Sequence, residues 1–185
     1  MGNILSTTGG GKLASLIKLA SSVANIPGDA AECGVWRGGS LCAIAKVLPG
    51  KTVYGFDTFS GLPKEAWSNC EIHNVGDFRD SSLEIVRENT AKFPNIILVP
   101  GIFPQTCGQL SDRSFAFVYL DFDFYLSTRD ALAWFLPRME IGGVIVFDDY
   151  EWKHCPGVKL AIDEFGLDVE QTVPHQAAHL VRAKR

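Results

Sequence analysis

The chain has 185 residues, a formal net charge of −4 at pH 7 and 46% hydrophobic residues. That length and apolar content suit one compact domain with a full hydrophobic core. The acidic balance offers no basic surface to a nucleic-acid backbone, so a nucleic-acid-binding function is excluded as a first interpretation. Five cysteines without a C-x-x-C pair are typical of reduced thiols, which favours a cytoplasmic protein.

Residues 1–27 predict a short leader followed by one helix. Residues 9–12 read Gly-Gly-Gly-Lys, but no strand precedes them and no Ser or Thr follows the lysine, so a flexible leader is favoured over a phosphate loop. From Leu13 to Ala24 apolar residues recur at helical spacing, which predicts an amphipathic helix packed on the domain. The apolar stretch is too short to span a bilayer, so we expect no membrane association.

A carboxylate stands just before a glycine-rich turn in the run Glu32-Cys-Gly34-Val-Trp-Arg-Gly38-Gly-Ser40. In nucleotide-binding α/β folds this turn lets a ligand lie against bare backbone, and an acid ending the next strand, here Asp57, binds a ribose hydroxyl pair. The glycine spacing is not G-x-G-x-x-G, and Glu32 would repel a pyrophosphate. A cationic adenosine cofactor, S-adenosylmethionine, therefore fits better than a dinucleotide. For the turn alone, an ordinary strand-to-helix connection stays an alternative.

Short apolar runs of strand length alternate with helical patterns along the rest of the chain, which predicts an α/β fold with a doubly wound, mostly parallel sheet. The predicted strands are Asp29–Gly34, Thr52–Asp57, Ile96–Gly101, Phe115–Asp121 and Gly142–Asp149. The predicted helices are Ser40–Leu48, a helix opened by the capping box Ser81-x-x-Glu84, Ser127–Pro137 and Val158–Phe165. The segments Asp168–Val173 and Gln176–Ala183 predict a closing hairpin whose last strand is antiparallel. Without repeats or linkers, residues 1–185 are expected to form a single domain.

The segment Thr58–Asp80 shows neither the helical nor the strand spacing of apolar residues. A long irregular loop inside a compact α/β domain is usually functional or disordered. Because it follows the strand ending in Asp57, it lies at the carboxyl edge of the sheet, over the ligand crevice. We expect a lid or substrate-facing loop, in which Trp67 contacts ligand or makes a local hydrophobic contact.

Acidic residues end the fourth and fifth predicted strands, as Asp121-x-Asp123 and Asp148-Asp149. Neighbouring parallel strands would bring these carboxylates to the edge that also carries Glu32, where they repel one another unless a cation lies among them. Hard oxygen ligands suit Mg²⁺, so Asp121, Asp148 and Asp149 are the predicted metal ligands. The alternative is that such Asp residues act only as turn formers or helix caps.

Six motifs in this order carry a resemblance to a known family. They are Glu32-Cys-Gly34-Val-Trp-Arg-Gly38-Gly39-Ser40, Gly55-Phe-Asp57-Thr-Phe-Ser60-Gly-Leu-Pro63, Gly76-Asp77-Phe78, Gly101-Ile-Phe103-Pro104-x-Thr106, Asp121-x-Asp123-x-Tyr125 and Asp148-Asp149-Tyr150. From about residue 28 to 165 the chain resembles the macrocin O-methyltransferase family, S-adenosylmethionine- and Mg²⁺-dependent sugar O-methyltransferases of macrolide biosynthesis. The resemblance implies a Rossmann-like class I methyltransferase fold with a seven-stranded sheet.

The resemblance also implies roles for individual residues. The residues expected to bind the cofactor are Glu32, Gly34, Val35, Trp36, Gly38, Ser40, Asp57, Thr58, Ser60, Asp77, Gly101, Phe103 and Asp121, with Asp77 or the Gly101–Phe103 turn near the adenine. Asp121, Asp148 and Asp149 would hold the metal. Asp121 is the expected catalytic residue on the acceptor side, and His154 is the candidate for taking the acceptor's proton.

The expected partner is a small hydroxylated acceptor, a glycoside or another vicinal diol. A second oxygen on the neighbouring carbon would fix the attacking atom at a metal. Family members carry a longer N-terminal segment, so we expect a small or extended glycoside to be accepted more readily than a macrolide. The sequence leaves the oligomeric state open, a homo-oligomer included. Two other functions stay open, a nucleotide-sugar glycosyltransferase with Asp121-x-Asp123 as its metal pair and a non-catalytic S-adenosylmethionine-binding module.

Overall fold

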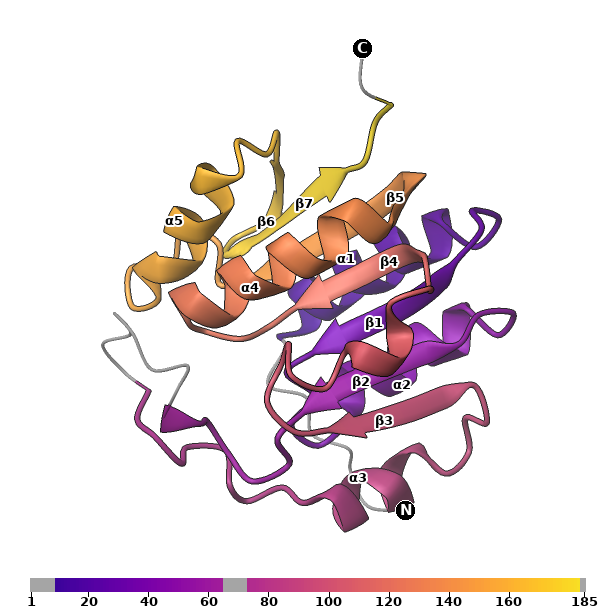
Figure 1. The fold of residues 1–185 in the computed structure, drawn as a ribbon, viewed down its shortest axis with the longest axis vertical. Helices are drawn as coiled ribbons and strands as arrows, with labels where there is room; N and C mark the ends of the chain where they lie inside the picture. Colours follow the sequence, from indigo (N-terminus) through magenta and orange to yellow (C-terminus); the bar gives the residue numbers. More distant parts are fainter. Residues whose placement is uncertain (1–8, 65–72, 184–185) are drawn as a thin grey trace.

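One seven-stranded sheet forms the centre of the fold, in the order β3-β2-β1-β4-β5-β7-β6 (Figure 1). The computed structural model describes residues 9–64 and 73–183. The strands are β1 (Asp29–Cys33), β2 (Val53–Asp57), β3 (Ile96–Pro100), β4 (Phe115–Leu120), β5 (Met139–Asp148), β6 (Glu170–Val173) and β7 (Gln176–Leu180). The first five run parallel, whereas β7 pairs antiparallel with both β5 and β6. The predicted mostly parallel sheet with an antiparallel last strand is confirmed.

Helices cover both faces of this sheet. They are α1 (Gly10–Ser22), α2 (Gly39–Val47), α3 (Leu83–Thr90), α4 (Tyr125–Phe135) and α5 (Pro156–Glu164). In Figure 1, α4 and α5 lie in front of the sheet, and α1 and α2 lie behind it. Two core clusters follow from this layering, because alternate residues of the central strands pack on opposite faces. Ala31 of β1 packs with α4 and α5, and its neighbour Ala30 packs with α1 and α2.

Several predicted boundaries differ from the observed ones, and three of the differences have a clear local reason. The N-cap of α3 is Ser82, which accepts a hydrogen bond from the Ile85 amide, whereas the predicted cap Ser81 donates its hydroxyl to the Trp36 carbonyl. Helix α4 begins at Tyr125, without a side-chain cap, rather than at Ser127. Strand β5 begins at Met139 rather than Gly142, because Met139 already pairs with β4.

The N-terminal helix was predicted correctly, but its start was not. Leu16 and Ala20 are fully buried, as an amphipathic helix requires. Residues 10–12, expected in a flexible leader, form the first turn of α1, where the Lys12 carbonyl accepts a hydrogen bond from Gln176. Tertiary contacts outweigh the poor helix propensity of glycine here. Within residues 9–64 and 73–183, every helix is too short or too polar to cross a bilayer.

Candidate active site

A cavity of about 530 Å³ lies at the carboxyl ends of the parallel strands, where doubly wound folds bind their ligands. Its volume falls within the range of small-molecule sites. The predicted residues that line it are Gly34, Trp36, Asp57, Thr58, Gly101, Phe103, Asp121, Asp148 and Asp149. The predicted residues outside its wall are Glu32, Val35, Gly38, Ser40, Ser60, Asp77 and His154. The structure therefore brings the ends of five strands together around one space.

The glycine-rich turn after β1 is held in place by Asp57. Gly34 adopts a φ of +89°, and a Cβ at this position would collide with the carbonyl oxygen of Asp121. One Asp57 oxygen accepts hydrogen bonds from the amides of Val35 (2.7 Å) and Trp36 (2.9 Å), and the other accepts one from the amide of Phe59 (2.8 Å). Asp57 thus orders the turn as well as facing the cavity. The ribose-binding role of Asp57 stays a prediction, and its role in ordering the turn adds to it.

Glu32 lies behind the turn rather than in the cavity wall. Its side chain is fully buried in β1, Oε1 accepts a 2.5 Å hydrogen bond from the Ser40 hydroxyl, and Oε2 has no hydrogen-bond partner. Burial raises the pKa of Glu32 to about 8, an effect opposed by Ser40 and increased by the charges of Asp57 and Asp148. At neutral pH the protonated form is favoured. The cofactor-binding role expected of Glu32 stays a prediction, and the residue lies beneath the turn rather than in the cavity wall.

The second wall of the cavity is acidic. Oxygen atoms of Asp121, Asp123 and Asp149 lie within 4.8 Å of one another. Asp123 and Asp149 adopt left-handed backbone conformations, with φ of +63° and +54°, which turn both side chains toward this group. Burial, followed by the charges of Asp148, Asp149 and Asp123, raises the pKa of Asp121 well above its ordinary range. Such crowding favours a bound cation.

These three carboxylates fit Mg²⁺, which binds oxygen ligands and is stabilised by concentrated negative charge. The metal-ligand roles of Asp121, Asp148 and Asp149 stay predictions. Asp148 lies outside this group, where it pairs with Lys12, whereas Asp123 lies within it. The reason is geometric, since Asp148 is the last residue of β5 and the chain turns sharply at Asp149.

Lys12 is the cation that sequence reasoning missed. From the first turn of α1, its Nζ lies 2.8 Å from Asp148 Oδ1 and 3.2 Å from Asp149 Oδ1. Burial opposes the charged ammonium, but the attraction of Asp148 and Asp149 outweighs it and raises the pKa of Lys12. Burial and the charge of Asp149 raise the pKa of Asp148 to about 6 despite the opposing effect of Lys12. The helical spacing from Leu13 predicted the helix, but it gave no signal that Lys12 contacts the end of β5.

The segment predicted as a lid or substrate loop contributes residues to the cavity at both of its described ends. Residues 65–72, which include Trp67, lie outside the described residues. The Leu62 amide donates to the Asp77 carbonyl (2.9 Å), which joins the two ends. Asp80 accepts hydrogen bonds from Trp36 Nε1 (2.8 Å) and Arg37 (2.7 Å), so the loop is also tied to the glycine-rich turn.

His73 is a second residue that the sequence analysis missed. Its Nε2 lies 3.5 Å from Asp123 Oδ1, its Nδ1 lies 3.8 Å from Asp77 Oδ2, and its ring packs beside Phe78. Asp77 faces this histidine, and its expected place near the adenine stays a prediction. His154, the predicted proton acceptor, is outside the cavity wall and packs on Trp152. His73 is therefore, like Lys12, a basic residue beside the acidic wall.

Comparison with known proteins identifies the family. The chain matches the model of the macrocin O-methyltransferase (TylF) family over residues 4–177. It belongs to that family. The predicted resemblance is thereby confirmed.

Relatives and solved structures agree with this assignment. The chain is 31% identical over 156 residues to the demethyldecarbamoylnovobiocin O-methyltransferase of Streptomyces niveus, covering 76% of this chain and 59% of that protein. It is 30% identical over 158 residues to the mycinamicin III 3''-O-methyltransferase of Micromonospora griseorubida, covering 76% and 61%. The chain thus spans about three fifths of the length of these relatives. The structure of the O-methyltransferase NovP superposes with a TM-score of 0.81 at 26% identity, covering 92% of this chain and 79% of that one.

The ion pair of Lys12 generates a stability prediction. Lys12→Met leaves Asp148 without its cation, so we expect the free energy of unfolding to fall by about 2 kcal/mol in chelator, less than for a fully buried pair because part of the lysine is solvated. Lys12→Arg should retain most of the wild-type stability. Urea unfolding measures the free energy of unfolding, with Lys18→Met on the exposed face of α1 as the matched control. Equal stability of wild type and Lys12→Met would show that the pair contributes nothing.

Proposed function

We propose that this protein is an S-adenosylmethionine-dependent O-methyltransferase that acts on a hydroxyl of a sugar or another vicinal diol in a small molecule. The observation that carries the proposal is that one cavity has two chemically different walls. One wall is the glycine-rich turn with Asp57, and the other is the group of Asp121, Asp123 and Asp149. A cofactor and a hydroxylated acceptor can thus meet in the same space, as methyl transfer requires.

The turn wall suits an adenosine with a positive charge. Gly34 exposes backbone where any side chain would collide, so a ligand can approach closely. Asp57 faces the cavity, and its oxygens can accept hydrogen bonds from ribose hydroxyls in addition to those from the turn. The nearby carboxylates would repel a pyrophosphate, whereas a sulfonium is attracted to them. These features support S-adenosylmethionine rather than a dinucleotide.

The acidic wall suits the acceptor. Asp121, Asp123 and Asp149 would hold Mg²⁺, which when bound supplies a Lewis acid that lowers the pKa of a hydroxyl and accepts a second oxygen from the neighbouring carbon. His73, whose Nε2 lies 3.5 Å from Asp123 Oδ1 on the cavity wall, is the group positioned to take the acceptor's proton. Aromatic rings of Phe56, Phe103 and Trp152 line the same cavity and limit the access of water.

The two other functions raised by the sequence receive less support. A nucleotide-sugar glycosyltransferase would bind a diphosphate beside carboxylates, and the chain belongs to a methyltransferase family instead. A non-catalytic cofactor-binding module would share the turn wall, but it would have no need for the carboxylates gathered on the acidic wall. Methyl transfer to any hydroxylated acceptor separates this last alternative from the proposal.

We expect calorimetric titration to show binding of S-adenosylmethionine and S-adenosylhomocysteine, and none of comparable strength for NAD. Asp57→Ala should weaken binding by about 1–3 kcal/mol, because charged hydrogen bonds to the ribose are lost. The affinity of Asp57→Asn, which keeps one acceptor oxygen, should lie between those of the wild type and Asp57→Ala. Asp112→Ala, at an exposed acid away from the cavity, is the control. Tighter binding of NAD than of S-adenosylmethionine would overturn the assignment of the cofactor.

Methyl transfer should require Mg²⁺ and stop in excess chelator, whereas cofactor binding should persist because the turn wall is separate from the acidic wall. Asp121→Asn should reduce turnover by at least about tenfold. A charged carboxylate crowded among other carboxylates is useful to the reaction only when it binds a cation. The rate of transfer of labelled methyl groups measures both the metal requirement and the effect of Asp121→Asn. The rates on vicinal diols are compared with those on matched mono-ols. Full activity in chelator would remove the carboxylates from the reaction, and equal rates on diols and mono-ols would refute the proposed acceptor class.

A further inference from the structure

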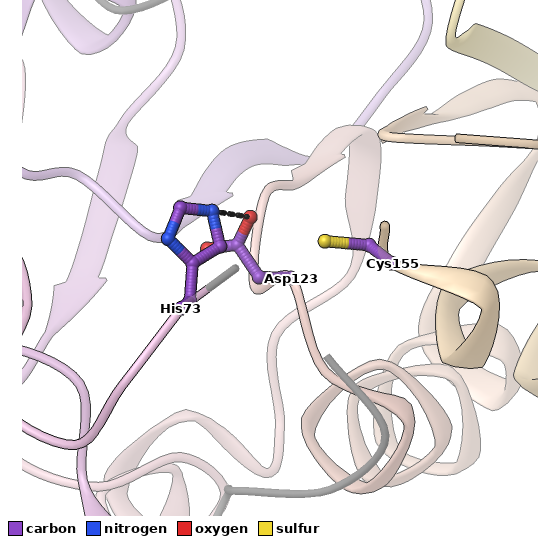
Figure 2. A group of neighbouring side chains, drawn as sticks. All are labelled: His73, Asp123 and Cys155. Atoms are coloured by element: carbon purple, nitrogen blue, oxygen red, sulfur yellow. Dashed lines mark ion pairs between the residues drawn. The ribbon is translucent and has the colours of Figure 1, made fainter. Parts of the chain in front are cut away.

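A second group of metal-binding side chains lies beside the acidic wall and has a different chemistry. It consists of His73, Asp123 and Cys155, which come from the loop before α3, the turn after β4 and the N-cap of α5. Their nitrogen, oxygen and sulfur atoms lie within 4.8 Å of one another. Figure 2 shows the sulfur of Cys155 directed toward Asp123, with the imidazole of His73 on the other side of that carboxylate. The three side chains converge from separate parts of the chain.

The donor set points to a thiophilic cation. Cysteine sulfur and histidine nitrogen are preferred ligands of Zn²⁺, whereas Mg²⁺ prefers oxygen alone. Tetrahedral Zn²⁺ with ordinary bond lengths places its ligand atoms about 3.3–3.6 Å apart. The distance of 3.5 Å between His73 Nε2 and Asp123 Oδ1 lies in that range, and the Cys155 sulfur lies within 4.8 Å of both atoms. His73 and Asp123 line the cavity, so a fourth position can stay open to it.

The surroundings of His73 and Cys155 also suit a metal. A metal-binding histidine usually directs its second ring nitrogen at a carboxylate, and Nδ1 of His73 faces Asp77 at 3.8 Å. Phe78 and Trp152 pack beside the imidazole and restrict its orientation. Cys155 is completely buried as the N-cap of α5, and the N-terminus of this helix would stabilise a thiolate that a metal holds.

We propose that His73, Asp123 and Cys155 form a second metal site, selective for Zn²⁺ over Mg²⁺, that inhibits this protein by withdrawing Asp123 from the acidic wall. Asp123 belongs to both groups of ligands. A carboxylate drawn toward a thiolate-bound cation is less available to Asp121 and Asp149. Zn²⁺ therefore weakens binding of a hard cation at the acidic wall. The coupling acts through one shared side chain and needs no rearrangement of the sheet.

Cobalt is the direct probe, because Co²⁺ replaces Zn²⁺ and absorbs strongly in the near ultraviolet when a thiolate binds it. We expect Co²⁺ titration of the Mg²⁺-saturated protein to produce this band at one equivalent. Cys155→Ser should abolish the band, His73→Gln should weaken binding by more than about tenfold, and Asp77→Asn should weaken it by about tenfold through the lost support of the imidazole. Cys42→Ser and His179→Gln are the controls, and Zn²⁺ should displace Co²⁺.

A second measurement tests the coupling. Zn²⁺ should release Mn²⁺ from the wild-type protein, seen as a rising electron paramagnetic resonance signal of free Mn²⁺, at a concentration at least about tenfold lower than from Cys155→Ser, where only direct competition at the carboxylates remains. Absence of the thiolate band, or a band that survives Cys155→Ser, would overturn the second site. If Cys155→Ser does not fold, His73→Gln decides, because Co²⁺ binding as tight as in the wild type would overturn the site. The cobalt band does not depend on methyl transfer, so the proposed function and this site can fail separately.

Discussion

Carboxylate crowding at one end of the sheet is the constraint on which the rest of the site depends. The six acids concerned are Glu32, Asp57, Asp121, Asp123, Asp148 and Asp149. Like charges in partly buried positions repel one another strongly, because little water is present to screen them. Folding is compatible with such a cluster only if each charge is neutralised or paired.

The compensation differs between the two halves of the sheet edge. On the β1 and β2 side, Glu32 is kept protonated by burial, and Asp57 accepts hydrogen bonds from three backbone amides. These acids shape a rigid turn against which a nucleoside can lie. On the β4 and β5 side, Lys12 pairs with Asp148 and Asp149, but Asp121 stays in a crowded group in which burial and the neighbouring charges raise its pKa. The site is therefore prepared for a cofactor on one side and for a cation on the other.

The sequence predicted those parts of the fold that depend on local patterns. Apolar runs and turn signals located the strands, and Gly34 and Asp57 were found because backbone freedom and strand-end acids are visible in a linear motif. Lys12 could not be found in this way, because its role depends on α1 crossing behind the sheet to reach β5. The three-residue spacing of Ser81 and Glu84 also misled, since the hydroxyl of Ser81 has a tertiary partner in the glycine-rich turn.

The direction of the side chains just after a strand ends was the other feature that could not be predicted from the sequence. Asp148 and Asp149 are adjacent, yet one faces Lys12 most closely and the other joins Asp121 and Asp123. The left-handed conformation of Asp149 produces this difference, and it is uncommon for residues other than glycine. His73 was missed because an irregular loop gives no period from which its position can be inferred.

The account rests on the claim that the two walls of the cavity bind different ligands at the same time. A crystal structure with S-adenosylhomocysteine and Mn²⁺, read by anomalous scattering, tests this most directly. We predict nucleoside density against Gly34 and Asp57 and a manganese peak among Asp121, Asp123 and Asp149. A manganese peak elsewhere, or a nucleoside bound away from the glycine-rich turn, would contradict the account.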